Sequence, residues 1–175
     1  VYFGGTSDCN IYTVPAGGGT PRVLFESYQI YPYQEKRYVV NQGACDLVGI
    51  TADGRYLYFI RAKYDGVTIT NGGAGYTLSA GKRFLERLDL QTGEAGTIHE
   101  GAEMAVMSAS GKYVACTDAG LNTYVIDTDT QEKWLLPIPR MAEGFIQDTY
   151  VFYRQADGDG VLQFFRIPIL GGEPE

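Results

Sequence analysis

The chain has 175 residues, enough for one domain with a hydrophobic core, and 45% of them are hydrophobic, so disorder is not indicated. Its formal net charge of −7 argues against unaided nucleic-acid binding, which depends on clustered Lys and Arg. No apolar run reaches the ~18 residues of a membrane helix, so we expect no membrane span.

Three short apolar runs, residues 1–5, 10–16 and 20–25, open the chain. The last two flank a turn of three glycines, and their β-branched and aromatic residues favour strands. Val1 already stands inside the first run with no Met before it, so we expect a fragment, a processed chain or a trimmed one.

Residues 47–60, LVGITADGRYLYFI, carry the strongest local signal. Two apolar runs flank an Asp53-Gly54 turn, which is typical of a β-hairpin. The pattern recurs at residues 105–117, where Ser110-Gly111 takes the place of Asp53-Gly54. A recurring hairpin indicates a repeat architecture.

No segment shows a sustained helical period, so we predict almost no helix. Residues 82–90, KRFLERLDL, fit either one face of a helix or a strand with Phe84, Glu86, Leu88 and Leu90 on one side. The repeat favours the strand, because other units place a strand there.

Four units can be aligned, residues 1–25, 47–100, 101–138 and 144–175. The turns near Asp129 and Gly171 are separated by ~40 residues, which is the period of a four-stranded propeller blade. With the strands of a blade labelled a to d from the centre outward, the first unit lacks strand a and the fourth lacks strand d.

Two segments resemble the TolB-like propeller repeat. Ala52-Asp53-Gly54-Arg55 with Tyr58-Phe59 matches its first half, and Ile11-Tyr12-Thr13-Val14-Pro15 with the three glycines and Val23-Leu24-Phe25 matches its second half. The resemblance implies an all-β fold of four-stranded antiparallel propeller blades, about four in number, and we expect an extracytoplasmic chain (periplasmic, secreted or at the cell surface).

About four blades are fewer than the usual six to eight, so we expect an arc of a larger propeller, with a closed four-bladed ring as the alternative. An arc exposes an apolar blade face at each end. Missing blades or a second copy of the chain, as in a homo-oligomer, would cover these open edges.

Two long irregular stretches, residues 26–46 and 63–81, connect strand d to a and strand b to c, so both fall on the same face of the blades. Long loops on a rigid scaffold commonly bind ligands, and Tyr with Asn, Asp and Arg suits a sugar or a peptide. Two simpler interpretations stay open: Tyr31 and Tyr38 belong to the core with residues 38–40 as an extra strand, and the Gly-rich second stretch is a mobile hairpin. The candidate ligand-binding residues are Tyr28, Tyr31, Tyr33, Arg37, Tyr64, Asp65, Asn71, Tyr76 and His99.

Several chemistries lack their residues. His99 is the only histidine and no G-x-S-x-G stands in the sequence, so a serine hydrolase triad is not expected. His99 could contact a ligand or be a solvated loop residue. One His and scattered Cys do not make a zinc site, and the acidic turn at residues 157–160 lacks further calcium ligands. We therefore expect no catalytic residue, no metal and no cofactor.

A carboxylate pair for glycoside hydrolysis stays open, since propeller enzymes assemble such pairs from different blades. The candidates are Asp46, Asp65, Glu103 and Asp118, with solvated turn residues as the alternative interpretation.

Three cysteines do not make a disulfide framework. Cys116 lies in an apolar strand pattern and fits a small buried hydrophobe, while Cys9 and Cys45 lie near loops and could pair.

The sequence predicts a non-catalytic binding or scaffold module that recognises a protein, peptide or glycan through the long-loop face. The alternative is the propeller domain of a larger hydrolase or lyase whose catalytic residues lie outside this chain.

Overall fold

The computed structural model describes residues 2–4, 10–33, 35–41, 45–70, 75–79, 81–138, 144–156 and 158–175. Within these residues the chain forms eighteen β-strands and no helix, which confirms the all-β prediction. A helix long and apolar enough to cross a bilayer is therefore absent from the described part.

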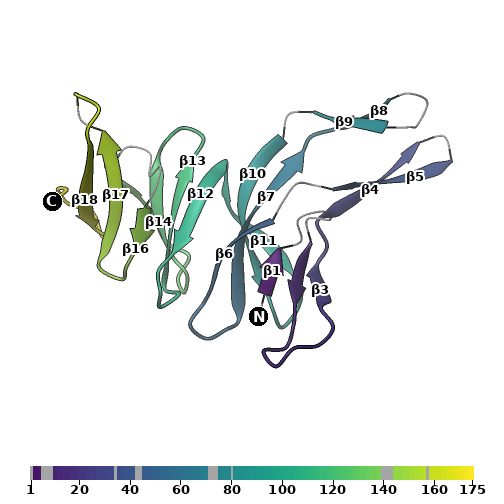
Figure 1. Ribbon diagram of the computed structural model, residues 1–175, viewed down its shortest axis with the longest axis horizontal. Coiled ribbons are helices and arrows are strands. Elements are labelled where there is room, and N and C mark those ends of the chain that lie inside the picture. Colours follow the sequence, from purple (N-terminus) through teal and green to yellow (C-terminus); the bar gives the residue numbers. More distant parts are fainter. Residues whose placement is uncertain are drawn as a thin grey trace.

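Four antiparallel sheets follow one another along the chain (Figure 1). The two central sheets have four strands each in the described residues, and the two terminal sheets have three each. Sheet 1 contains β1 (Tyr2–Gly4), β2 (Ile11–Thr13) and β3 (Arg22–Phe25); sheet 2 contains β6 (Cys45–Ile50), β7 (Tyr56–Tyr64), β10 (Gly81–Asp89) and β11 (Ala95–Glu100); sheet 3 contains β12 (Ala102–Met107), β13 (Tyr113–Asp118), β14 (Thr123–Asp127) and β15 (Lys133–Leu136); sheet 4 contains β16 (Gly144–Ile146), β17 (Tyr150–Ala156) and β18 (Leu162–Pro168).

Both predicted hairpins form, β6 with β7 and β12 with β13. Their turns have the same chemistry: the carbonyls of Thr51 and Ser108 accept hydrogen bonds from the N–H groups of Gly54 and Gly111, each at 2.8 Å. Both glycines have positive φ, 71° and 76°, a conformation that glycine adopts without steric cost. The turn sequence therefore sets the geometry that starts each inner hairpin.

Strand β7 explains why residues 56–60 read as one continuous apolar run. Side chains alternate between the two faces of a strand, and here both faces are covered. Leu57 and Phe59 pack toward sheet 1, whereas Tyr58 and Ile60 pack toward sheet 3. A third buried cluster joins sheets 3 and 4, so three apolar layers hold four sheets in a row.

The stretches predicted to be irregular are hairpins. Residues 26–46 contain β4 (Tyr28–Tyr33) paired with β5 (Lys36–Asn41), and residues 63–81 contain β8 (Val67–Thr70) paired with β9 (Gly75–Leu78). The prediction of irregular loops was therefore wrong, and the simpler interpretations, an extra strand at residues 38–40 and a hairpin in the Gly-rich stretch, were right. Tyr, Ile, Val and Thr are frequent in both stretches, and such residues favour paired strands.

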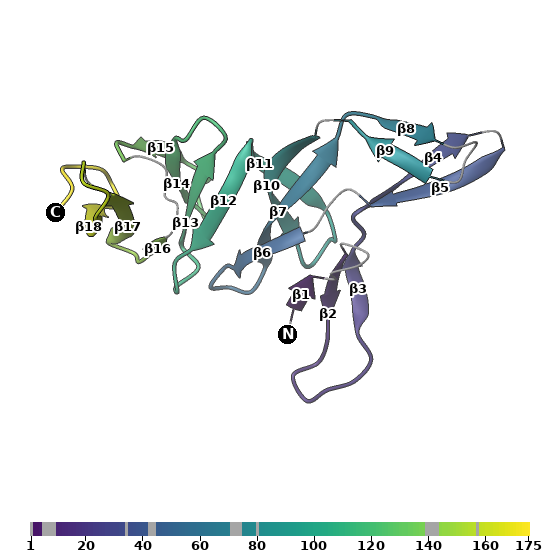
Figure 2. The ribbon, with the colours of Figure 1, turned by 45° about the horizontal axis from the view of Figure 1, so that its top comes forward.

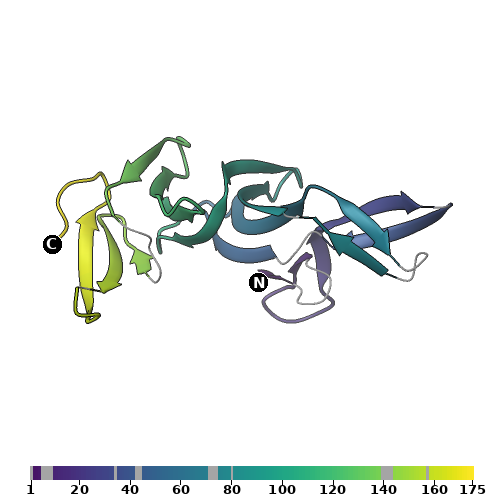
Figure 3. The same cartoon turned by 90° about the horizontal axis from the view of Figure 1, so that it is seen from above.

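The four sheets form an open row with the C-terminus at one end, and not a closed ring (Figures 1 and 3). At that end the chain turns at Gly171-Gly172 and begins to pair with β18: the N–H of Arg166 donates to the carbonyl of Glu175 at 3.0 Å, and the reverse bond measures 2.8 Å. Sheet 4 thus carries the start of a fourth strand.

Cys116 is buried and free, as its apolar surroundings predicted, and burial raises the pKa of its thiol to about 12. Cys9 lies outside the described residues, as does the side chain of Cys45, so their pairing stays a prediction.

Two turn glycines give a matched test of how tightly sheets 2 and 3 pack. A Cβ at Gly111 would come within 2.6 Å of the carbonyl oxygen of Ile50 and 2.8 Å of the N of Ala52, both backbone atoms of the neighbouring sheet. A Cβ at Gly54 meets nothing within 4 Å. We expect Gly54→Ala to lower the free energy of unfolding by about 1–2 kcal/mol through its positive φ alone.

We expect Gly111→Ala to cost about 1–3 kcal/mol more, because the two sheets must also move apart. Urea denaturation of both variants measures the difference. Equal losses would show that the two turns do not touch.

Candidate functional site

The two inserted hairpins, β4–β5 and β8–β9, project side by side from one end of the molecule (Figures 1 and 2). The β8–β9 hairpin continues the ladder of β7 and β10, in which Tyr64 pairs with Gly81. The short β6–β7 turn lies at the opposite end of sheet 2 (Figure 1). The expected separation into a long-connection end and a short-turn end is thus present.

The predicted ligand-binding residues divide into two places. Tyr28 and Tyr76 are exposed large side chains on the two hairpins, 36% and 40% accessible, and Arg37 and Asp65 are exposed as well. Tyr31 and Tyr64 are half-buried. Asn71 and the side chain of Tyr33 lie outside the described residues. Six described candidates thus lie at the long-connection end, spread along the two hairpins: Tyr28, Tyr31, Arg37, Tyr64, Asp65 and Tyr76.

His99 lies elsewhere, between sheets 2 and 3. It is buried, which excludes the solvated-loop alternative, and its ring packs on Tyr124 at 4.8 Å between centroids. Its Nδ1 lies 3.1 Å from Nζ of Lys133, and its Nε2 is buried with no hydrogen-bond partner among the described residues. Burial lowers the pKa of His99, the charge of Lys133 lowers it further, and the charge of Asp118 raises it.

The carboxylates proposed for glycoside hydrolysis do not form a described pair. Asp46 binds Arg83 at 2.6 Å, and Asp118 accepts the N–H of Asn122 at 2.9 Å inside a turn. Asp65 and Glu103 are exposed. Within the described residues, no group of three or more His, Cys, Asp or Glu is placed to hold a metal ion.

A buried ionic cluster at the base of the hairpins was not predicted. The Glu86 side chain is only 2% accessible and pairs with Arg61, at 2.8 Å from Nη2 to Oε2, and with Lys63. The Thr97 hydroxyl donates to Glu86 Oε1 at 3.3 Å. The signal was in the sequence: Glu86 stands on the apolar side of the strand 82–90, where an acid must have partners once it is buried.

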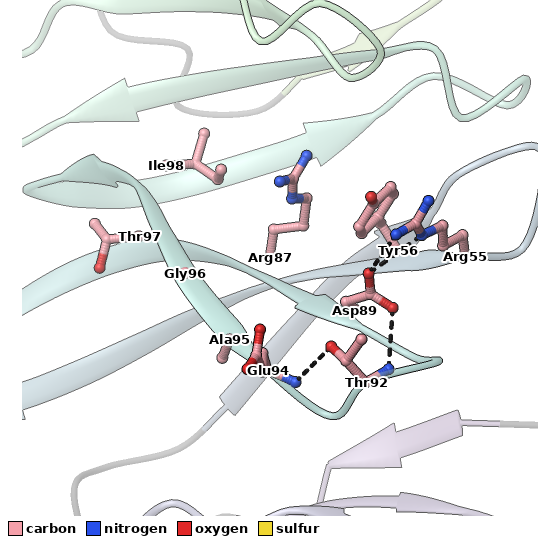
Figure 4. Close-up of a pocket in the computed structure, with 10 residues that line it drawn as sticks. All are labelled: Arg55, Tyr56, Arg87, Asp89, Thr92, Glu94, Ala95, Gly96, Thr97 and Ile98. Carbon is pink, nitrogen blue, oxygen red and sulfur yellow. Dashed lines mark hydrogen bonds and ion pairs between the residues drawn. The ribbon is translucent and has the colours of Figure 1, made fainter.

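A hollow of about 430 Å³ opens at the short-turn side of sheet 2 (Figure 4). Figure 4 shows Arg87, Tyr56 and Arg55 in a row along one wall, with Asp89 beside Arg55. The guanidinium carbons lie 4.8 Å (Arg55) and 4.3 Å (Arg87) from the Tyr56 ring centroid. The ten residues that line the hollow are Arg55, Tyr56, Arg87, Asp89, Thr92, Glu94, Ala95, Gly96, Thr97 and Ile98.

The two arginines differ in their partners. Arg55 donates to Oδ2 of Asp89 from Nε at 3.1 Å and from Nη2 at 2.9 Å. Arg87 forms no ion pair with any described residue, and its polar partner is the hydroxyl of Tyr58. Burial raises the pKa of Tyr58, and hydrogen bonds from Gln131 and Arg87 partly offset that rise. The hollow therefore holds one neutralised and one unneutralised guanidinium. Sequence reasoning missed this hollow, because residues that meet there, such as Arg55 and Asp89, are 34 positions apart in the chain.

No protein-family model and no curated protein sequence matches the chain. Among solved structures, it is similar to an oligogalacturonate lyase from Vibrio parahaemolyticus (TM-score 0.53, 15% identity, covering 100% of this chain and 45% of that one). It is also similar to an oligogalacturonate lyase in complex with manganese (TM-score 0.51, 16% identity, 85% and 46% covered). A puromycin-hydrolysing peptidase of Mycobacterium tuberculosis matches as well (TM-score 0.62, 12% identity, 99% and 28% covered).

These neighbours have β-propeller folds, and the likeness shows that this chain has a β-propeller fold too. The chain spans less than half the length of each of them.

The Glu86 cluster predicts a large effect of one carboxylate. We expect Glu86→Ala to lower the free energy of unfolding by about 3 kcal/mol, because Arg61 and Lys63 lose their buried counter-charge. Glu100→Ala is the matched control: Glu100 pairs with Lys82 at 2.5 Å, but both side chains are more than half exposed, so no measurable change is expected. Chemical denaturation compares the two variants, and equal stability would show that Glu86 is not held as a buried charge.

His99 predicts a pH dependence. Its folded pKa lies below the ordinary value of 6.5, so the unfolded chain binds the proton first as the pH falls. Stability should therefore be full above pH ~7 and should decline as the pH drops through ~6.5 toward the folded pKa. Melting temperatures between about pH 5.5 and 8, the window of histidine titration, should vary less in His99→Gln than in the parent chain. The same decline in both proteins would contradict this assignment.

Proposed function

We propose that this chain is the propeller part of a larger hydrolase or lyase, and that it contributes a substrate-binding surface beside catalytic residues outside these 175 residues. One observation carries the proposal: the whole chain matches less than half of enzymes that cleave oligogalacturonate or hydrolyse puromycin. Two of the three solved structures named above are oligogalacturonate lyases, which favours an acidic oligosaccharide over a peptide as the substrate class.

The chemistry of the chain supports this division of labour. The sequence has no G-x-S-x-G, and its only histidine is buried between two sheets with Lys133 at Nδ1. A general base needs access to the reacting group, and His99 has none in this arrangement. These observations support a binding role for this chain.

The long-connection end is the proposed binding surface. Tyr28 and Tyr76 stand exposed on the two hairpins, and Arg37 and Asp65 are exposed charged residues at the same end. Tyrosine contributes a rigid amphipathic ring that loses little conformational entropy on binding, so this composition suits a sugar or a peptide. The finer assignment to TolB-like repeats and an extracytoplasmic location belong to the same proposal.

A second candidate function is the non-catalytic binding or scaffold module predicted from the sequence. The same exposed hairpin residues favour it, and it needs no partner domain. The two functions differ in one measurable property, which is catalysis by the complete reading frame.

The experiment compares the 175-residue chain with the full reading frame that contains it, using oligogalacturonate and an aminoacyl amide as substrates. We expect the complete protein to cleave one of them and the chain alone to cleave neither. A complete protein that binds without cleaving would favour the scaffold function, and turnover by the chain alone would contradict both.

The binding surface is tested on the chain itself. We expect Tyr76→Ala to weaken the affinity for the cleaved substrate about 10-fold, as the loss of one aromatic contact of ~1.4 kcal/mol. Leu135→Ala is the control, since Leu135 is 55% exposed on β15, outside the hairpins. Calorimetric titration measures both, and an unchanged affinity in Tyr76→Ala would remove the hairpin end as the binding surface.

A further inference from the structure

The hollow beside Arg87 has a counterpart in sheet 4. The carbonyl of Arg55 accepts from Leu90 N at 2.9 Å, and the carbonyl of Thr149 accepts from Ile169 N at 2.9 Å. These equivalent bonds align the two sheets residue by residue, and place Tyr150 at the position of Tyr56 and Arg166 at the position of Arg87.

In sheet 4 the arginine is neutralised by a carboxylate of the chain itself. Arg166 lies over the Tyr150 ring with its guanidinium carbon 4.7 Å from the centroid. Its Nε and Nη2 donate to Oε2 of Glu175 at 2.9 and 2.5 Å. Glu175 also pairs with Arg166 through the backbone, so it is the residue opposite this arginine on the next strand.

In sheet 2 the residue opposite the arginine is a glycine. Arg87 pairs in register with Gly96, and a Cβ at Gly96 would meet nothing within 4 Å. Arg87 lies over Tyr56 at 4.3 Å, forms no ion pair with a described residue and borders the hollow of about 430 Å³. The space that Glu175 occupies in sheet 4 is thus open in sheet 2.

Sheet 3 has neither an arginine nor a carboxylate at these two positions. The equivalent of Arg87 there is Val125, which is fully buried, and the residue opposite is Trp134. In sheet 3 the apolar Val125 therefore faces the ring of Trp134, whereas in sheet 4 Arg166 faces Glu175. Only Arg87 faces an open space among these three described pairs.

We propose that this hollow binds a small organic carboxylate, which takes against Arg87 the place that Glu175 takes against Arg166. A guanidinium recognises a planar carboxylate by paired N–H donors, and a half-buried one gains from a counter-charge. Arg55 stays bound to Asp89. The site lies on the short-turn side and does not depend on the proposed function.

The test titrates the 175-residue chain with glucuronate and with glucose, which differ at one carbon by a carboxylate. We expect glucuronate to bind and glucose not to bind. Arg87→Gln should weaken glucuronate binding about 10- to 100-fold, as the loss of a charge-assisted hydrogen-bonded pair does. Arg22→Gln is the control, since Arg22 is exposed on β3 of sheet 1.

A second variant, Gly96→Glu, supplies a carboxylate from the strand position that Glu175 has in sheet 4. We expect this variant to lose glucuronate binding. We also expect it to have a higher melting temperature than the parent chain when no ligand is present. The double variant Arg87→Gln/Gly96→Glu should lose that rise. Equal binding of glucose and glucuronate, no binding of either, or a melting temperature of Gly96→Glu that does not depend on Arg87 would overturn the proposal.

Discussion

Burial of β7 on both faces is the constraint on which this structure depends. Leu57 and Phe59 fill the layer toward sheet 1, and Tyr58 and Ile60 fill the layer toward sheet 3. One strand of β-branched and aromatic residues therefore joins two interfaces, and neither sheet could move away without exposing it. The β8–β9 hairpin extends from the end of this strand, and the Arg87 hollow lies at its beginning.

Charge appears where this apolar stripe ends. The face that carries Leu57 and Phe59 continues into Arg61 and Lys63, and the strand beside it supplies Glu86. Burying such a cluster removes its charges from water at a cost in free energy, and the cluster is stable only when all its members are present. Removing one buried carboxylate can therefore lower the free energy of unfolding more than removing several exposed ion pairs. It also lies on the two strands that continue into the β8–β9 hairpin, so a binding surface on that hairpin rests on a rigid support.

The repeat keeps its backbone and changes its side chains. Equivalent turns and equivalent hydrogen bonds recur from sheet to sheet, while the position of Arg87 holds Val125 in sheet 3 and Arg166 in sheet 4. Function on a repeat scaffold lies where one copy differs from the others, because packing explains what they share. Gly96 opposite Arg87 is such a difference.

The sequence by itself determined the all-β class, the two inner hairpins, the strand at residues 82–90 and the separation of long connections from short turns. Each depends on local rules: turn chemistry, alternation of side chains and strand order. Tertiary structure alone decided that His99 is buried on Tyr124, that Glu86 has two cationic partners, and that Arg87 forms no ion pair with a described residue. These facts depend on which side chains of distant strands and neighbouring sheets come into contact, and such contacts join residues far apart in the chain, which no local pattern encodes.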